Sequence, residues 1–310
     1  MAWILLATTG QFINAVVAII DKYIVSDQKV SIRPFVYAFY SCLLTGAWVA
    51  VYLLGFLPMS DVLHIPTYKN VQAPTLIVVS LSLLAAYTFF MALVSMYDAL
   101  RQADASDVMP VIGAVSVLAS FGMSYYFLDS RLSQNFIIGI IVLSFGTFLV
   151  SHTRFNYKVT LITLHSGIFF AFHYITMKGL FQETSFDDGF FWSRIAFVGF
   201  TLSLLMVPAY LDKVRNQTTN TTKNTGFLIL LAKILAGVAA FMLLKATDWG
   251  DVTVVQALDG LKYVFIIIIA VLFAKFLPKS ATDKQSDRKV IARKLLYVVI
   301  ITIGFVVLFL

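Results

Sequence analysis

Four polar residues near the carboxyl end of the chain occupy a strongly apolar setting. They lie in the stretch 251–274 and are Gln256, Asp259, Lys262 and Tyr263. Their spacing of three or four residues places them on one face of an α-helix. An Asp or a Lys near the centre of a bilayer costs about 2.5–3.5 kcal/mol, and such residues generally face an internal cavity. We therefore expect this face to contact a substrate, with a pair that only fixes helix packing as the alternative.

Three further ionisable side chains interrupt other apolar stretches. Lys233 lies at a depth comparable with that of Lys262, so two lysines beside one aspartate would suit an anionic or carboxylate-bearing substrate. Arg194 follows an aromatic run, which favours a side chain that snorkels to the membrane surface; facing inward, it would suit a carboxylate or phosphate. His173 could relay protons because imidazole titrates near neutrality, but a hydrogen-bonded structural histidine is the favoured interpretation.

The composition indicates a membrane protein. Hydrophobic residues make up 60% of the chain and charged residues 13%, whereas soluble domains contain about 25% charged residues. The single cysteine, Cys42, excludes a disulfide framework and a cysteine-based metal site. Many basic residues lie in short loops, so the net charge of +7 reflects membrane topology and does not indicate nucleic acid binding.

The elements that must position these side chains are transmembrane helices. A helix of about 20 residues spans the roughly 30 Å hydrocarbon core. Ten apolar stretches of suitable length cover 3–25, 34–57, 74–98, 106–128, 134–152, 159–181, 189–210, 226–246, 251–274 and 291–310. They are continuous apolar runs without strand-like alternation, which favours helices. The expected class is an all-α integral membrane protein with ten transmembrane helices.

A sequence repeat divides the ten stretches into two sets of five. Segment 101–108 matches 245–252 in its pattern of a basic residue, two aspartates and a valine at equal spacing, each between the third and fourth stretch of its set. Lys22 near the end of the first stretch corresponds to Lys178 near the end of the sixth. An odd number of helices per set inverts the second repeat, an arrangement recurrent in transporters. A chance match of two Asp-rich turns is the alternative.

Several landmarks follow the fourth stretch. Its start, 105–112, combines small residues with Pro110. At its end stands Asp129, in the sequence Asp-Ser-Arg-Leu-Ser. Two glycines, Gly139 and Gly146, lie in the next stretch. This combination resembles the EamA-like ten-helix members of the drug/metabolite transporter superfamily, in which the acidic residue is usually Glu.

The resemblance implies a fold and a general function. It implies two inverted five-helix repeats, 1–153 and 154–310, around a central cavity, and a secondary transporter of small metabolites. The second repeat departs from the motif, because Val254 stands where Pro110 would align. The motif residues carry no substrate information.

The leading functional hypothesis is a secondary active transporter that exports or exchanges a small polar metabolite by alternating access. Proton coupling would involve Asp259 or His173, and Lys233 and Lys262 would orient the substrate. A nucleotide-sugar or organophosphate antiporter of the same superfamily is the main alternative. The chain contains no GxSxG or HExxH motif, which argues against an intramembrane enzyme. A non-transporting scaffold also has little support. We expect no enzymatic activity, cofactor or metal.

Loop charges predict the orientation in the membrane, which would be the plasma or inner membrane in a prokaryote. Lys and Arg are more frequent in the odd-numbered loops, which we therefore expect to be cytoplasmic, with both termini outside. Two glycosylation sequons, at Asn216 and Asn220, fall in a loop that this count places inside.

Overall fold

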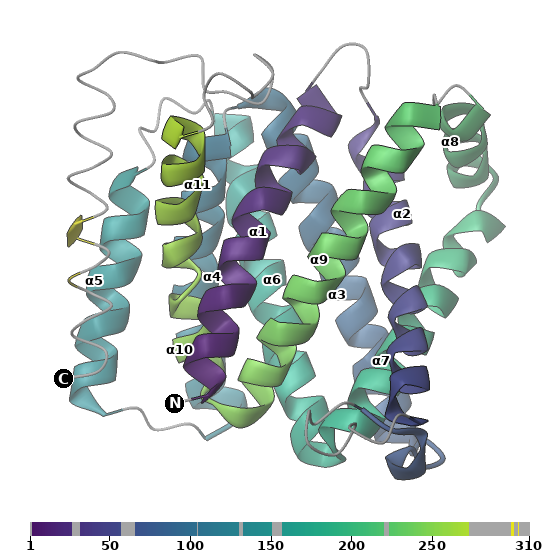
Figure 1. Cartoon of the computed structure of the whole chain (residues 1–310), viewed down its shortest axis with the longest axis horizontal. Coiled ribbons are helices and arrows are strands. Elements are labelled where there is room, and N and C mark those ends of the chain that lie inside the picture. Colours follow the sequence, from purple (N-terminus) through teal and green to yellow (C-terminus); the bar gives the residue numbers. More distant parts are fainter. Residues whose placement is uncertain are drawn as a thin grey trace.

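The protein is a bundle of helices (Figure 1), described by a computed structural model over residues 2–26, 32–56, 66–103, 105–129, 133–150, 157–219, 223–272, 299–300 and 303. These residues contain no strand. The α-helices are α1 (Ala2–Ser26), α2 (Pro34–Gly46), α3 (Leu76–Gln102), α4 (Ala105–Phe127), α5 (Gln134–Val150), α6 (Tyr157–Glu183), α7 (Phe186–Ser203), α8 (Pro208–Thr219), α9 (Lys223–Trp249), α10 (Val252–Ala257) and α11 (Gly260–Leu272). Three 3-10 helices join them, η1 (Ala47–Phe56), η2 (Tyr68–Asn70) and η3 (Leu204–Met206).

The distribution of side chains is that of a protein in lipid. Seven of the described helical segments are long and apolar enough to cross a membrane. Large apolar side chains face outward, for example Leu76 at 82% and Phe227 at 67% exposure, whereas Asp21 and Lys233 are buried. A soluble protein would not expose so much apolar surface while burying its charges. The chain is a multi-pass α-helical membrane protein.

Two predicted spans differ in detail from the observed helices. The stretch 34–57 is an α-helix only to Gly46 and continues as the 3-10 helix η1. In the stretch 189–210 the helix α7 and the short η3 end before Val207, and α8 begins at Pro208. The break has a local cause, because the residue before a proline disfavours the helical conformation. Asn216 lies on α8, in a segment that the sequence predicts as a loop.

Some predictions concern residues that the structure does not describe. The stretch 291–310 lies almost entirely outside the described residues, as do Asn220 and the basic loop 275–290. The remaining nine predicted stretches all contain described helix, although α5 has only 17 residues.

The predicted single helix over 251–274 is wrong. The chain forms α10 and α11, separated by a turn at Leu258 and Asp259. Asp251 caps α10, because its Oδ1 accepts hydrogen bonds from the backbone N–H groups of Thr253 and Val254. The break has a local cause: the Asp259–Gly260 dipeptide is a turn signal, and both residues have poor helix propensity.

One buried lysine, Lys22, and one partly buried lysine, Lys178, stabilise helix ends. On α1, Lys22 Nζ donates hydrogen bonds of 2.7 Å to both the Leu100 and Ala103 carbonyl oxygens at the end of α3. On α6, Lys178 Nζ donates to carbonyl oxygens at the end of α9, those of Thr247, Asp248 and Gly250, at 2.8–3.1 Å. Cations at helix carboxyl ends satisfy unpaired carbonyl groups and complement the helix dipole.

Contacts between helices are concentrated on a few pairs. The most extensive contacts between elements are those of α3 with α6 and of α1 with α9, and α4 also packs closely on α6.

Candidate functional site

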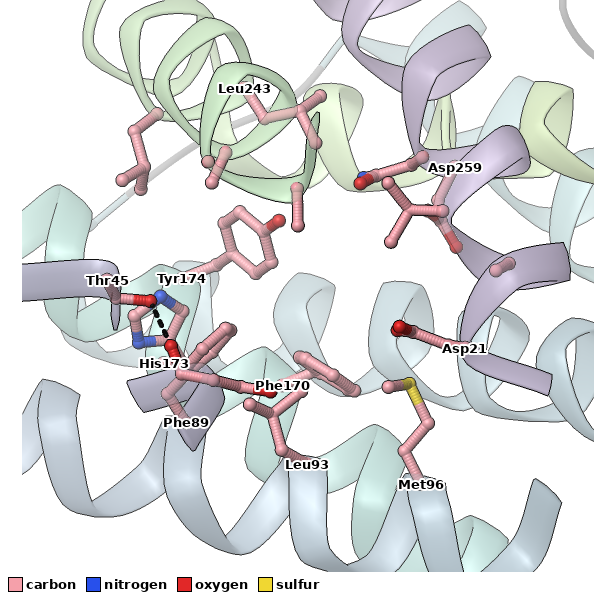
Figure 2. A pocket seen from close by; sticks show the side chains of 18 of the residues that line it. Asp21, Thr45, Phe89, Leu93, Met96, Phe170, His173, Tyr174, Leu243 and Asp259 are labelled. Atoms are coloured by element: carbon pink, nitrogen blue, oxygen red, sulfur yellow. Dashed lines mark hydrogen bonds between the residues drawn. The ribbon is translucent and has the colours of Figure 1, made fainter. Parts of the chain in front are cut away.

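A cavity inside the bundle brings together six of the seven candidate residues. It has a volume of about 170 Å³ and is lined by side chains from α1, α2, α3, α4, α6, α7, α9, α10 and α11. The candidates that line it are Gln256, Asp259, Lys262, Lys233, Arg194 and His173. Figure 2 shows Asp21 and Asp259 extending into the cavity from one side, and His173 and Tyr174 from the other.

The break between α10 and α11 holds an ion pair at the cavity wall. Lys262 Nζ donates to Asp259 Oδ1 at 2.7 Å and to Oδ2 at 2.9 Å. The Tyr263 hydroxyl lies 2.9 Å from Asp259 Oδ2 and 2.5 Å from the Met109 carbonyl oxygen on α4. Tyr263 is not among the residues that line the cavity, and its hydroxyl instead contacts the Asp259 carboxylate. Asp259 and Lys262, three residues apart, thus form an ion pair, as their spacing on one helix face predicts.

Helix α4 approaches this ion pair closely because it carries a glycine there. A Cβ atom added at Gly113 would lie 2.1 Å from the Tyr263 hydroxyl and 2.8 Å from Asp259 Oδ2. One turn further along α4, the Ser116 hydroxyl donates to Gln256 Oε1 at 3.1 Å. These contacts fix both Gln256 and Asp259 against α4.

A second ion pair joins α1 to α9. Lys233 Nζ lies 3.1 Å from Asp21 Oδ1 and 2.9 Å from the Tyr97 hydroxyl on α3. Tyr37 on α2 donates to Asp21 Oδ1, and its ring centroid lies 4.0 Å from Lys233 Nζ. The expectation that Lys233 adds positive charge beside a single aspartate is therefore wrong, because Asp21 compensates it.

Sequence reasoning missed Asp21 and Tyr97 as cavity residues, and it missed Tyr37 as a further partner of Asp21. Asp21 lies near the end of its helix, where an exposed carboxylate is ordinary, and nothing in the local pattern relates it to Lys233. The signal that could have found it is its position: Asp21 interrupts the same buried side of α1 as the apolar residues Val17 and Ala18, which also line the cavity.

Arg194 does not reach the membrane surface. The residue is 3% exposed and lines the cavity, so the snorkelling interpretation is wrong. Its guanidinium lies between two rings of its own helix, 4.7 Å from the Phe190 centroid and 4.8 Å from that of Phe197. Its only hydrogen bonds within the described structure are two of 3.4 Å to the Ser193 hydroxyl. The ring contacts and the depth of the side chain keep the charge inside the bundle.

His173 is hydrogen-bonded and packed among aromatic rings. Its Nδ1 lies 3.0 Å from the Ala85 carbonyl oxygen of α3, so this nitrogen is the donor. The imidazole ring lies 4.7 Å from the Phe89 centroid and 6.0 Å from that of Phe197. The hydrogen bond expected of a structural histidine is present, and the residue also lines the cavity. Within the described residues, no group of three His, Cys, Asp or Glu side chains could hold a metal ion.

Comparisons with known proteins show the fold. No protein-family model and no curated protein matches the chain. Solved structures do match, 26 chains in total. One, described only as "Crystal structure of protein", aligns over 97% of this chain and 95% of its own length, with a TM-score of 0.63 and 13% identity. At that identity the likeness concerns the fold alone.

The Asp21–Lys233 pair gives a first prediction. Lys233→Met should lower the free energy of unfolding by about 3–5 kcal/mol, because it leaves a buried carboxylate without its cation. The double variant Asp21→Asn/Lys233→Met should lose less than the sum of the two single variants, by at least about 1 kcal/mol. The measurement is denaturant-induced unfolding in detergent micelles.

A matched control removes an ion pair outside the cavity. Lys245 and Asp248 lie 3.5 Å apart with the same i,i+3 spacing as Asp259 and Lys262, and are partly exposed. Their double replacement by Met and Asn should cost about 0–1 kcal/mol. Additive losses at Asp21 and Lys233 would show that the two groups do not interact.

The close approach of α4 gives a second prediction. Gly113→Ala should lower the thermal unfolding temperature by several degrees, because the new methyl group collides with Tyr263 and Asp259. Tyr263→Phe should recover part of that loss, since it removes the nearest atom. Gly122→Ala on the same helix is the control: its Cβ would meet nothing within 4 Å, so this variant should be neutral or slightly stabilised. Equal effects of the two alanines would contradict the contact.

Proposed function

We propose that the protein is a secondary transporter that moves a small polar metabolite, as an exporter or exchanger, by alternating access. The observation that carries the proposal is the cavity itself, enclosed by membrane helices and lined by Arg194, Lys233 and Lys262. Ionisable side chains in a membrane interior are costly and typically mark a substrate or ion pathway. The interrupted helix α10–α11 adds support, because transporter sites commonly form where a helix is discontinuous.

We further propose ten transmembrane helices in two inverted five-helix repeats, 1–153 and 154–310, of the EamA-like type. The lysine contacts support the repeat: Lys22 binds the carboxyl end of α3, and its counterpart Lys178 binds that of α9. A two-fold relation that exchanges α1 with α6 and α3 with α9 converts the α1–α9 pair into the α6–α3 pair, and these are the pairs with the most extensive contacts.

Alternating access would then be a movement of one repeat relative to the other around the cavity. The Asp21–Lys233 pair crosses between the repeats, and so do the contacts of Gln256 and Tyr263 with α4. These contacts are among the polar contacts between the two repeats that would rearrange as the cavity opens to either side.

An organophosphate exchanger is the second candidate function. Arg194, which has no carboxylate partner among the described residues, favours an anionic substrate of some kind. The volume of about 170 Å³ argues against a nucleotide sugar in this state of the cavity.

Cysteine labelling tests the proposed orientation, with odd-numbered loops in the cytoplasm. Cys42 is buried, so Cys42→Ser provides a background for single cysteines. Lys69→Cys, in an even-numbered loop, should react with a membrane-impermeant maleimide in intact cells. Arg101→Cys, at the exposed end of α3, should react only after permeabilisation. The reverse pattern would place the odd-numbered loops outside.

Transport in proteoliposomes tests the function and the role of the Asp259–Lys262 pair. The solute is selected by thermal stabilisation of the purified protein in a screen of amino acids, polyamines, nucleotide sugars and sugar phosphates, since a bound ligand stabilises the folded state. Asp259→Asn and Lys262→Met should each lower the initial uptake rate at least about tenfold, the loss expected from about 1.4 kcal/mol.

The control for this experiment is the Lys245–Asp248 pair, which lies outside the cavity. Lys245→Met and Asp248→Asn remove the same charges and should retain uptake. Unchanged uptake and pH dependence in both cavity variants would refute the assigned role of Asp259 and Lys262. Absence of uptake for every stabilising solute would count against transport.

A further inference from the structure

The charges that line the cavity do not balance. Lys233 is paired with Asp21 and Lys262 with Asp259, at 3.1 Å and 2.7 Å. Arg194 has no carboxylate partner among the described residues, so three cations against two carboxylates leave one positive charge at the cavity. A buried charge without a partner is strongly unfavourable, and an anion that enters the cavity would relieve the cost.

The surroundings of Arg194 suit a carboxylate. The rings of Phe190 and Phe197, at 4.7 and 4.8 Å, hold the guanidinium in place without using its strong hydrogen-bond donors. The contacts to Ser193 at 3.4 Å are long, so most of the N–H groups remain available to a ligand. A planar guanidinium binds a carboxylate through two parallel hydrogen bonds.

The rest of the cavity suits a small aromatic or apolar body. Aromatic side chains contribute much of its lining: Trp48, Phe89, Phe170, Tyr174 and Phe241. The volume of about 170 Å³ is comparable with the roughly 150 Å³ of an engineered protein cavity that binds benzene. One ring with a short substituent therefore fits, and offset or edge-to-face ring contacts would stabilise it.

The cavity offers no free acid for a second, cationic group. The Asp259 carboxylate accepts from Lys262 with both oxygens, and Asp21 accepts from Lys233 and two tyrosines. An ammonium group would have to displace one of these lysines. We propose that the substrate is a monocarboxylate with an aromatic or apolar body and no other charge, bound through its carboxylate by Arg194. This assignment rests on the transport function proposed above.

Head-group variation on a constant phenyl body tests the ligand class. The probes are phenylacetate, phenyl phosphate, phenylalanine, phenethylamine and 2-phenylethanol, at equal concentrations, and the readout is the thermal unfolding temperature of the purified protein. Phenylacetate should give the largest increase. An equal or larger increase with phenyl phosphate, phenylalanine, phenethylamine or 2-phenylethanol would overturn the assignment, and so would no increase with any probe.

Substitutions at Arg194 test the contact itself. Arg194→Gln should weaken phenylacetate binding at least about tenfold, and Arg194→Lys, which keeps the charge but loses the planar fork, should weaken it less. Arg101→Gln, at an exposed position on α3, is the matched control and should bind as the wild type does. Binding within twofold of wild type in Arg194→Gln refutes the role of Arg194. If Arg194→Gln does not fold, the head-group series and the affinity of Arg194→Lys for phenylacetate test the contact instead. Wild-type affinity in Arg194→Lys would contradict a bidentate contact.

Counterflow of radiolabelled phenylacetate separates this inference from the proposed function. The wild type should exchange it faster than protein-free liposomes, with Arg194→Gln reduced at least tenfold. Binding without exchange would contradict transport and leave the ligand class standing. Exchange of another solute by a protein that does not bind phenylacetate would overturn the ligand class and leave transport standing.

Discussion

The ion pair between Asp21 and Lys233 is the interaction on which the interior of this protein depends. In a membrane interior each charge alone would strongly destabilise the fold, and the ion pair itself needs further hydrogen bonds to offset its desolvation. Tyr37 and Tyr97 supply them, so that α1, α2, α3 and α9 converge on a single carboxylate. The same four helices contribute side chains to the lining of the cavity.

A second constraint acts where the helix that carries the polar face is interrupted. The turn at Asp259 presents the carboxylate to Lys262 and Tyr263, and Gly113 allows α4 close enough for its Met109 carbonyl oxygen to meet the tyrosine hydroxyl. With both aspartates paired, Arg194 becomes the distinctive group of the cavity. Its unbalanced charge, set among aromatic rings, is the basis for proposing an anionic substrate with an apolar body.

Much of the fold and part of the site could be predicted from local patterns. The composition and the length of the apolar stretches gave the membrane class, and the i,i+3 spacing gave the Asp259–Lys262 pair. The predictions that were wrong concern how neighbouring helices pack around a side chain. Depth along a helix could not distinguish a snorkelling Arg194 from a buried one, because the direction of its side chain depends on where α7 packs. The Asp259–Gly260 dipeptide is a turn signal, but it lies within a long apolar stretch, a pattern that favours one continuous helix.

The sequence by itself determined which residues are costly in a membrane, and hence that Gln256, Asp259, Lys262, Lys233, Arg194 and His173 must find an interior environment or reach the surface. Only the tertiary structure decided how each charge is compensated. Asp21 and Lys233 are 212 residues apart, and their hydrogen bond exists because α1 packs along α9. Periodicity and spacing act within one helix, whereas the balance of charge in a cavity is a property of all the helices that enclose it.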